Sequence, residues 1–222
     1  MPNILIVRLS AVGDVVHGLP VLCALRDFIP RARLTWLVEE RAAGVLRGHA
    51  ALDRLITVPR GWLRNPAAIW RLRRELRRLR PEIAIDLQGL TKSAAAGWLS
   101  RAGVRIGFDR HEGRELSRML NTRRVKTSAM HVVDRYLELL EPLGIRRPPV
   151  RFDLPRHSED EATIGRFVRD RGLASGFAVI NPGAGWPSKR WPVERFAAVA
   201  KHLGQRRYLP TVVAWAGAEE WT

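Results

Sequence analysis

Short apolar runs alternate along the first 140 residues with longer segments in which apolar residues recur at helical spacing. The runs predict buried strands at residues 4–7, 34–38, 53–58, 81–87 and 104–108. The longer segments predict helices at residues 15–29, 66–80, 94–100 and 130–140, with a further short helix at 41–46. Strands and helices that alternate in this way predict an α/β fold, a doubly wound parallel sheet with right-handed crossovers.

A break in this alternation separates two predicted domains. Gly144-Ile-Arg-Arg-Pro-Pro149 is typical of a stop, and Pro155 and a charged stretch follow it. We therefore expect domains at residues 1–155 and 156–222. In the second domain the pattern predicts helices near 164–168 and 193–202 and strands at 177–181 and 211–215. A doubly wound nucleotide-binding domain needs about twice that length, so we expect residues 156–222 to be the first part of a truncated domain.

Candidate chemistry lies directly after the first strand. Residues 10–13 are small and turn-prone, Asp14 follows, and the helical spacing begins at Val15. In open parallel sheets the carboxyl ends of strands are where ligands bind, so Asp14 is expected to face a cleft. A carboxylate there could act as a general base. It could also cap the helix, because Asp is favoured at helix starts, and the residues alone leave both interpretations open.

Basic residues follow two further predicted strands. Arg60 and Arg64 come after the strand at 53–58, and Lys92 comes after the strand at 81–87. Lys92 is expected near helix N-terminal amides, where a local anionic ligand explains a lysine better than stability does. For Arg60 and Arg64 a substrate-phosphate role and a solvated position remain open. The many arginines of the helix at 66–80 are interpreted as a solvated face above an apolar stripe.

The charge balance bears on the choice of partners. Lys and Arg total 38 against 22 Asp and Glu, a formal net charge of +16, and most of the excess is arginine. Such a field attracts nucleic acid, anionic membranes or phosphorylated substrates, although a GC-rich genome would also enrich arginine. No apolar stretch approaches the ~18 residues that span a bilayer, and no signal peptide is recognisable. With Cys23 as the one cysteine, expected in the core, these features predict a cytoplasmic protein.

Three segments together resemble glycosyltransferase family 9, the ADP-heptose:lipopolysaccharide heptosyltransferases. They are the opening segment at residues 4–17, Asp86-Leu-Gln-Gly-Leu-Thr-Lys-Ser93, and residues 181–192 with Asn-Pro-Gly-Ala and Ser-Lys-Arg-Trp-Pro. Residues 89–93 and 131–135 look closest to the heptosyltransferase I group. The resemblance covers the whole chain in matching order. It implies a GT-B-like fold, with a Rossmann-like N-terminal domain for the acceptor and a Rossmann-like, here incomplete, C-terminal domain for the nucleotide sugar.

The resemblance also implies site residues. Asp14 matches the catalytic base, and Lys189 matches the lysine that holds the donor diphosphate. The other residues on the donor side are Gly183, Ala184 and Glu219 or Glu220. The residues on the acceptor side are Ser10, Gly13, Arg60, Arg64, Lys92 and Arg114, of which the basic ones would meet phosphates and Kdo carboxylates. From its loop alone, Lys189 could equally be a surface lysine.

The implied reaction is inverting transfer of heptose from ADP-L-glycero-D-manno-heptose to Kdo-lipid A in the lipopolysaccharide inner core. The implied partners are these substrates and the anionic membrane surface at the cytoplasmic face of the inner membrane, where the protein would be peripheral. No metal, cofactor or nucleic acid is implied, and the oligomeric state stays open. The family's Asp-Thr-Gly-like donor motif has no counterpart in the sequence, so we expect low activity from these 222 residues.

Two alternatives remain open. One is a family-9 transferase that uses another nucleotide sugar or acceptor. The other is a non-enzymatic basic module that binds nucleic acid, which predicts steep salt dependence. The sequence contains no helix-turn-helix or aromatic RNA-binding motif that would favour the second alternative.

Overall fold

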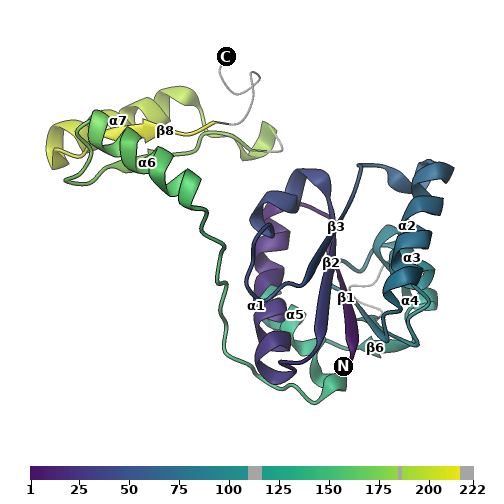
Figure 1. Cartoon of the computed structure of the whole chain (residues 1–222). Helices are drawn as coiled ribbons and strands as arrows, with labels where there is room; N and C mark the ends of the chain where they lie inside the picture. Colours follow the sequence, from purple (N-terminus) through teal and green to yellow (C-terminus); the bar gives the residue numbers. More distant parts are fainter. Residues whose placement is uncertain (110–116, 185–186, 216–222) are drawn as a thin grey trace. The chain divides into compact units, whose positions relative to one another are not determined.

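The computed structural model describes residues 1–109, 117–184 and 187–215. The chain divides into two compact units, Met1–Pro155 and Arg156–Thr222. Each unit is built on a parallel sheet of its own (Figure 1). In the described part of the chain, no helix is long and apolar enough to cross a membrane.

The first unit contains six parallel strands in the order β3-β2-β1-β4-β5-β6. The strands are β1 (Asn3–Val7), β2 (Arg33–Glu39), β3 (Arg54–Val58), β4 (Ile83–Asp86), β5 (Val104–Phe108) and β6 (Arg123–Val125). The strand order reverses direction between β1 and β4. At such a switch point open α/β sheets bind ligands, outside the carboxyl ends of the strands. The predicted parallel α/β sheet is confirmed.

Helices cover both faces of this sheet (Figure 1). One face carries α1 (Val12–Phe28) and α5 (Val132–Glu138), and the other carries α2 (Pro66–Leu79), α3 (Thr91–Leu99) and α4 (Ser117–Leu120). The shorter 3-10 segments are η1 (Glu40–Val45), η2 (Trp62–Arg64) and η3 (Glu141–Leu143). Successive residues of β1 serve two hydrophobic cores: Ile4 and Ile6 pack on the α1 side, and Leu5 and Val7 pack on the α2 side.

A glycine lets α1 lie close to the sheet. A Cβ at Gly18 would lie 2.9 Å from the Trp36 ring, which is shorter than real Cβ contacts. The Trp36 side chain is fully buried, and its Nε1 donates to the Arg8 carbonyl oxygen at 3.2 Å. The close approach at Gly18 therefore fixes the helix that follows β1.

Several element boundaries differ from the prediction. Because α1 begins at Val12, Asp14 lies inside the first helical turn rather than ahead of it. Because α3 begins at Thr91, Lys92 also lies inside a helix. Residues 40–45 form a 3-10 helix, and β6 is not predicted because its two arginines break the apolar pattern. Cys23 is buried, as predicted.

The second unit contains a two-stranded parallel sheet. Its elements are α6 (Ser158–Asp170), β7 (Ala178–Ile180), η4 (Pro187–Lys189), α7 (Val193–Arg207) and β8 (Thr211–Val213). The two strands and two α-helices agree with the predicted elements. Leu173 is the one buried hydrophobic residue in the described part of this unit, so the apolar core of the chain lies in the first unit.

Candidate active site

Hydrogen bonds join the loops that follow β1 and β4 at the switch point of the first sheet. The Leu9 amide donates to Gln88 Oε1 at 2.9 Å, and Arg8 Nη1 donates to the Leu87 carbonyl oxygen at 2.8 Å. Arg8 is buried, and its guanidinium lies over the Tyr136 ring, 5.4 Å from the ring centroid. These contacts fix the short loop between β1 and α1.

Asp14 projects from the first turn of α1 and is held through one oxygen. Arg8 Nη2 lies 2.6 Å from Asp14 Oδ2, and the Ala11 amide donates to the same oxygen at 3.1 Å. The second contact is a helix-capping interaction, one of the two interpretations that the sequence leaves open. Asp14 Oδ1 has no hydrogen-bond partner among the described residues, and 43% of the side chain is exposed. This oxygen is free to meet a substrate hydroxyl.

Lys92 has an anionic partner within the chain. Its Nζ lies 2.7 Å from Glu39 Oε1 and donates to Ser10 Oγ at 3.3 Å. Glu39 ends β2 and its side chain is only 8% exposed, whereas the Lys92 side chain is 32% exposed. The sequence predicts an anionic ligand beside Lys92, and in the structure the carboxylate of Glu39 occupies that place. The contact joins the carboxyl ends of β1, β2 and β4.

A pocket of about 830 Å³ lies at this edge of the sheet. Its lining comes from the segments after β1, β2 and β3 and from the start of α3: Ser10, Ala11, Val12, Glu39, Arg41, Ala42, Arg60, Gly61, Leu63, Arg64 and Lys92. Arg41, Arg60 and Arg64 are exposed, and their side chains have no hydrogen-bond or ion-pair partner in the described part of the chain. Three unpaired guanidiniums in one pocket favour a ligand with several phosphates or carboxylates.

A buried carboxyl group supports the turn that precedes Lys92. Asp86 Oδ1 accepts hydrogen bonds from the Gln88 amide at 2.9 Å and from the Gly89 amide at 3.1 Å. Gly89 has φ of 67°, a left-handed conformation that glycine adopts without strain. Burial raises the pKa of Asp86 above its ordinary value, although hydrogen bonds to the charged form oppose the rise.

The structure brings four of the predicted acceptor residues together. Ser10, Arg60, Arg64 and Lys92 all line the 830 Å³ pocket. Gly13 is exposed in the first turn of α1, and no atom lies within 4 Å of the place where its Cβ would be. Arg114 lies outside the described residues.

Three charged residues of the site are not singled out by the sequence. Arg8 follows β1, Glu39 ends β2, and Arg41 lies in η1 directly after β2. The strand-end rule that selects Arg60 and Lys92 would also have found these three, because β1 and β2 are neighbours and their carboxyl ends meet at one edge.

The predicted donor residues of the second unit follow β7. The Gly183 amide donates to Asn181 Oδ1 at 3.1 Å, and the Ala184 carbonyl oxygen accepts from Arg190 Nε at 3.2 Å. Lys189 is exposed at the end of η4, and its side chain has no partner among the residues that the structure describes. Glu219 and Glu220 lie outside the described residues.

Several cations line the first-unit pocket, and the half-exposed carboxylate of Asp14 follows the lining residue Val12 in the first turn of α1. A carboxylate can take a proton from a hydroxyl, and guanidinium groups bind phosphate and carboxylate. Within the described ranges, no group of His, Cys, Asp and Glu side chains is arranged to hold a metal ion. The arrangement suits proton abstraction from a substrate that is itself negatively charged.

Proteins of known sequence that resemble this chain include several heptosyltransferases. The model of glycosyltransferase family 9 (heptosyltransferase) matches residues 69–221. Lipopolysaccharide heptosyltransferase 1 of Escherichia coli (strain K12) is 31% identical over 201 residues, which cover 85% of this chain and 62% of that protein. The chain thus spans about 62% of the length of the curated relatives that it matches.

Solved structures resemble the chain as well. The glycosyltransferase family 9 structure from Veillonella parvula DSM 2008 has a TM-score of 0.82 at 26% identity, over 96% of this chain and 62% of that one. The structure of E. coli heptosyltransferase WaaC with ADP-2-deoxy-2-fluoro heptose has a TM-score of 0.78 at 28% identity, over 98% of this chain and 70% of that one. These similarities confirm the predicted α/β, GT-B-like fold class.

Proposed function

The chain belongs to glycosyltransferase family 9, and we propose that it acts as an inverting, metal-independent heptosyltransferase. The proposed donor is ADP-L-glycero-D-manno-heptose, and the proposed acceptor is Kdo-lipid A of the lipopolysaccharide inner core. Residues 1–155 bind the acceptor, and residues 156–222 contribute to binding the donor. The similarity to lipopolysaccharide heptosyltransferase 1 and to a heptosyltransferase structure with an ADP-heptose analogue supports this choice.

The position of Asp14 beside the arginine-rich pocket is the observation that carries the proposal. Asp14 follows β1 in the first turn of α1, and its Oδ1 has no hydrogen-bond partner in the described part of the chain. Arg41, Arg60 and Arg64 provide unpaired positive charge in the adjoining pocket. An acceptor with phosphates and Kdo carboxylates complements that charge, and a hydroxyl that must lose a proton complements Asp14.

Asp14 Oδ1 takes the proton of the acceptor hydroxyl during transfer. The acceptor oxygen forms a bond to the anomeric carbon from the face opposite ADP, and the bond between that carbon and the ADP oxygen breaks with its electron pair leaving on ADP. Arg8 keeps the carboxylate in place through Oδ2, at 2.6 Å. Positive charge on Lys189 and the Ala184 amide stabilise the leaving diphosphate.

The acceptor's chemistry also sets the proposed location. Kdo-lipid A is held in a bilayer, so a transferase that modifies it works at a membrane surface. We place the protein at the cytoplasmic face of the inner membrane, as a peripheral protein. The formal net charge of +16 favours association with anionic lipid there.

Two assays of the 222-residue chain test the proposal. Heptose transfer is followed by mass spectrometry of Kdo-lipid A after incubation with ADP-heptose, and acceptor binding is measured separately without donor. Asp14→Asn keeps an oxygen for the Ala11 amide but removes the base, so transfer is expected to fall about a hundredfold or more while acceptor binding changes little. Asp27→Asn is the matched control, because Asp27 also lies on α1 and pairs with an arginine, Arg151, at 2.8 Å.

The outcomes separate the parts of the proposal. Equal transfer by the wild type and Asp14→Asn, with wild-type transfer above the background measured without protein, contradicts the role of Asp14 as base. Acceptor binding without transfer from ADP-heptose, but with transfer from another nucleotide sugar, contradicts the proposed donor alone. Failure of the wild-type chain to bind Kdo-lipid A contradicts the assignment of residues 1–155 to the acceptor.

A further inference from the structure

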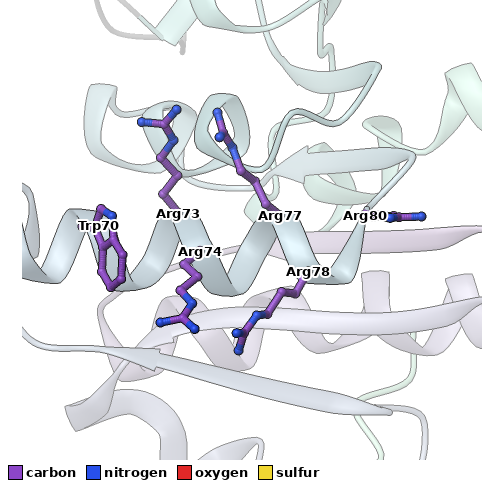
Figure 2. Close-up of a pocket in the computed structure, with 6 residues that line it drawn as sticks. All are labelled: Trp70, Arg73, Arg74, Arg77, Arg78 and Arg80. Carbon is purple, nitrogen blue, oxygen red and sulfur yellow. The ribbon is translucent and has the colours of Figure 1, made fainter.

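The outer face of α2 carries a dense group of arginines around an exposed tryptophan. The group lines a shallow hollow of about 730 Å³ and consists of Trp70, Arg73, Arg74, Arg77, Arg78 and Arg80. Figure 2 shows Arg73 and Arg77 leaning to one side of the helix and Arg74 and Arg78 leaning to the other. Trp70 is 58% exposed, and Arg74 lies over its ring at 5.4 Å from the centroid.

The basic surface continues onto the end of α3. A second hollow of about 450 Å³ shares Arg73 and Arg77 with the first and is also lined by Trp98, Arg101 and Arg105. Trp98 is 55% exposed. We call the residues of the two hollows the α2–α3 face. It therefore presents two tryptophans within a field of arginines.

The charge of this face is not neutralised by the acidic residues that the structure describes. No acidic residue lines either hollow in the described part of the structure. The acid of α2, Glu75, pairs instead with Arg54 at 2.9 Å. Partial burial, and then the positive charges of Arg101 and Arg73, lower the pKa of Arg77. An anion bound from outside the chain would reduce the repulsion between these arginines.

The apolar stripe of α2 is not available to a partner. Ala68, Leu72 and Leu76 are buried in the core of the first unit. The helix therefore does not present this stripe to a bilayer, and its arginines and Trp70 are among the side chains that reach outward. Tryptophan is favoured at the level of lipid headgroups, and arginine binds lipid phosphate. A shallow contact with an anionic lipid surface satisfies both residue types.

We propose that the α2–α3 face docks the protein onto a membrane of anionic phospholipid, with arginines on lipid phosphates and Trp70 and Trp98 at headgroup depth. The inference deepens the proposed function, because it names the surface through which a transferase of lipid-linked acceptors would reach them. The helix α2 links the two sites, since Arg64 lines the acceptor pocket and α2 begins two residues later at Pro66.

Vesicle sedimentation with the 222-residue chain, without donor or acceptor, tests the docking surface. The wild type is expected to bind vesicles containing about one third phosphatidylglycerol in phosphatidylcholine and to leave pure phosphatidylcholine vesicles unbound. Binding should weaken when salt rises from about 0.1 M to about 0.5 M, because exposed charges are screened. The quadruple variant Arg73→Gln, Arg74→Gln, Arg77→Gln and Arg78→Gln should lose about tenfold or more in affinity.

A charge-matched variant distinguishes the effect of this surface on vesicle binding from the effect of net charge. Replacing four other exposed arginines by Gln changes the charge equally: Arg31, Arg47, Arg123 and Arg124. This control should retain binding within about twofold, since those side chains lie outside both hollows. Equal loss in the two quadruple variants overturns the proposal, as does equal binding of neutral vesicles by the wild type. Circular dichroism checks that both variants fold.

Two further measurements identify the partner. Trp70→Ala and Trp98→Ala should each weaken vesicle binding by a few fold, and part of this loss should remain at high salt. Brominated lipids should quench the tryptophan fluorescence of the wild type. A single-stranded oligonucleotide bound through the same four arginines, with no sedimentation on anionic vesicles, overturns the lipid assignment in favour of nucleic acid. Vesicle binding by a wild-type chain that does not bind Kdo-lipid A would contradict the proposed acceptor and leave the docking surface in place.

Discussion

Two ion pairs determine where the charged side chains of the pocket point. In each pair a nearly buried residue at a strand end holds a more exposed residue at a helix start. Arg8 holds Asp14, whose side chain is 43% exposed, and Glu39 holds Lys92, whose side chain is 32% exposed. The buried partner sets the orientation before any substrate binds, and such preorganisation is what an active site needs.

The pair of Glu39 and Lys92 should respond unequally to loss of either partner. Lys92→Ala leaves the Glu39 carboxylate buried without a cation, so we expect a loss of about 2 kcal/mol or more in the free energy of unfolding. Glu39→Gln leaves Lys92 able to reach water, so the expected loss is about 1 kcal/mol or less. Urea unfolding of both single variants measures the difference.

The double variant Glu39→Gln and Lys92→Ala is the control for this pair. It removes both charges and should be more stable than Lys92→Ala alone, because no buried charge remains unpaired. Equal losses in the two single variants would mean that Glu39 is not more strongly desolvated than Lys92.

Asp86 should make stability depend on pH. Burial raises its pKa in the folded protein above the ordinary value of 3.8, so the folded state binds this proton more tightly than the unfolded chain does. The stability gained from the protonated form is full at low pH and decreases as pH rises from 3.8 toward the folded pKa. Asp86→Asn, which keeps an acceptor for the Gln88 and Gly89 amides, should lack this decrease.

The difference between the wild type and Asp86→Asn, measured by urea unfolding at several pH values, isolates this carboxyl group. Burial lowers the pKa of His49, so protonation of His49 reduces the free energy of unfolding as pH falls. This effect is the same in both proteins and cancels in their difference. Asp86→Ala is the control, because it leaves two amides unpaired and should be about 2 kcal/mol less stable than Asp86→Asn at every pH. A difference that does not change with pH would show that the carboxyl group titrates alike in both states.

At the scale of elements, the contact between α1 and β2 depends on the absence of a side chain at Gly18. Gly18→Ala would place a methyl group against the Trp36 ring, where a Cβ lies at 2.9 Å, so we expect a net loss of about 1–2 kcal/mol. Gly13→Ala on the same helix is the control, since nothing lies within 4 Å of its Cβ position. Alanine there should gain about 0.5 kcal/mol from helix propensity. Chemical unfolding of both variants provides the comparison.

The sequence predicts elements well where their residues face the core and poorly where they face solvent. The strand at 4–7 is wholly apolar, and the structure confirms it. The strand β6 is not predicted because two of its three residues are exposed arginines at the sheet edge. The start of α1 is placed too late because Val12 and Gly13 are exposed and carry no apolar periodicity.

The site residues that the sequence predicts are those next to strands with a clear apolar pattern. Arg60, Arg64 and Lys92 are predicted because each follows a strand that the apolar pattern identifies. The partner of Lys92 is not predicted, because Glu39 lies 53 positions away and only the order of the strands brings it near. Asp14 makes its capping contact and its ion pair with Arg8 through the same oxygen, Oδ2. A sequence pattern cannot predict which oxygen of a carboxylate is engaged.

At the scale of the whole molecule, the segment before the unit boundary belongs to the first unit. Arg151 Nη2 lies 2.8 Å from both Asp27 oxygens, and the Phe152 side chain packs against the α1-side core. The Phe152 carbonyl oxygen also lies 3.4 Å from His49 Nε2. Both hydrophobic cores consist of residues that precede Pro155. We therefore expect the first unit to fold by itself.

A fragment of residues 1–155 is accordingly expected to unfold in one cooperative transition, with the fully buried Trp36 and Trp62 reporting it by fluorescence. A fragment of residues 1–149 is the control: it lacks Phe152 and Arg151 and should be less stable by about 1–2 kcal/mol, mostly from lost apolar burial. If the longer fragment also retains Kdo-lipid A binding while the shorter one only loses stability, acceptor binding resides in the first unit. A fragment of 1–155 that lacks a cooperative transition would show that the first unit needs residues 156–222 to fold.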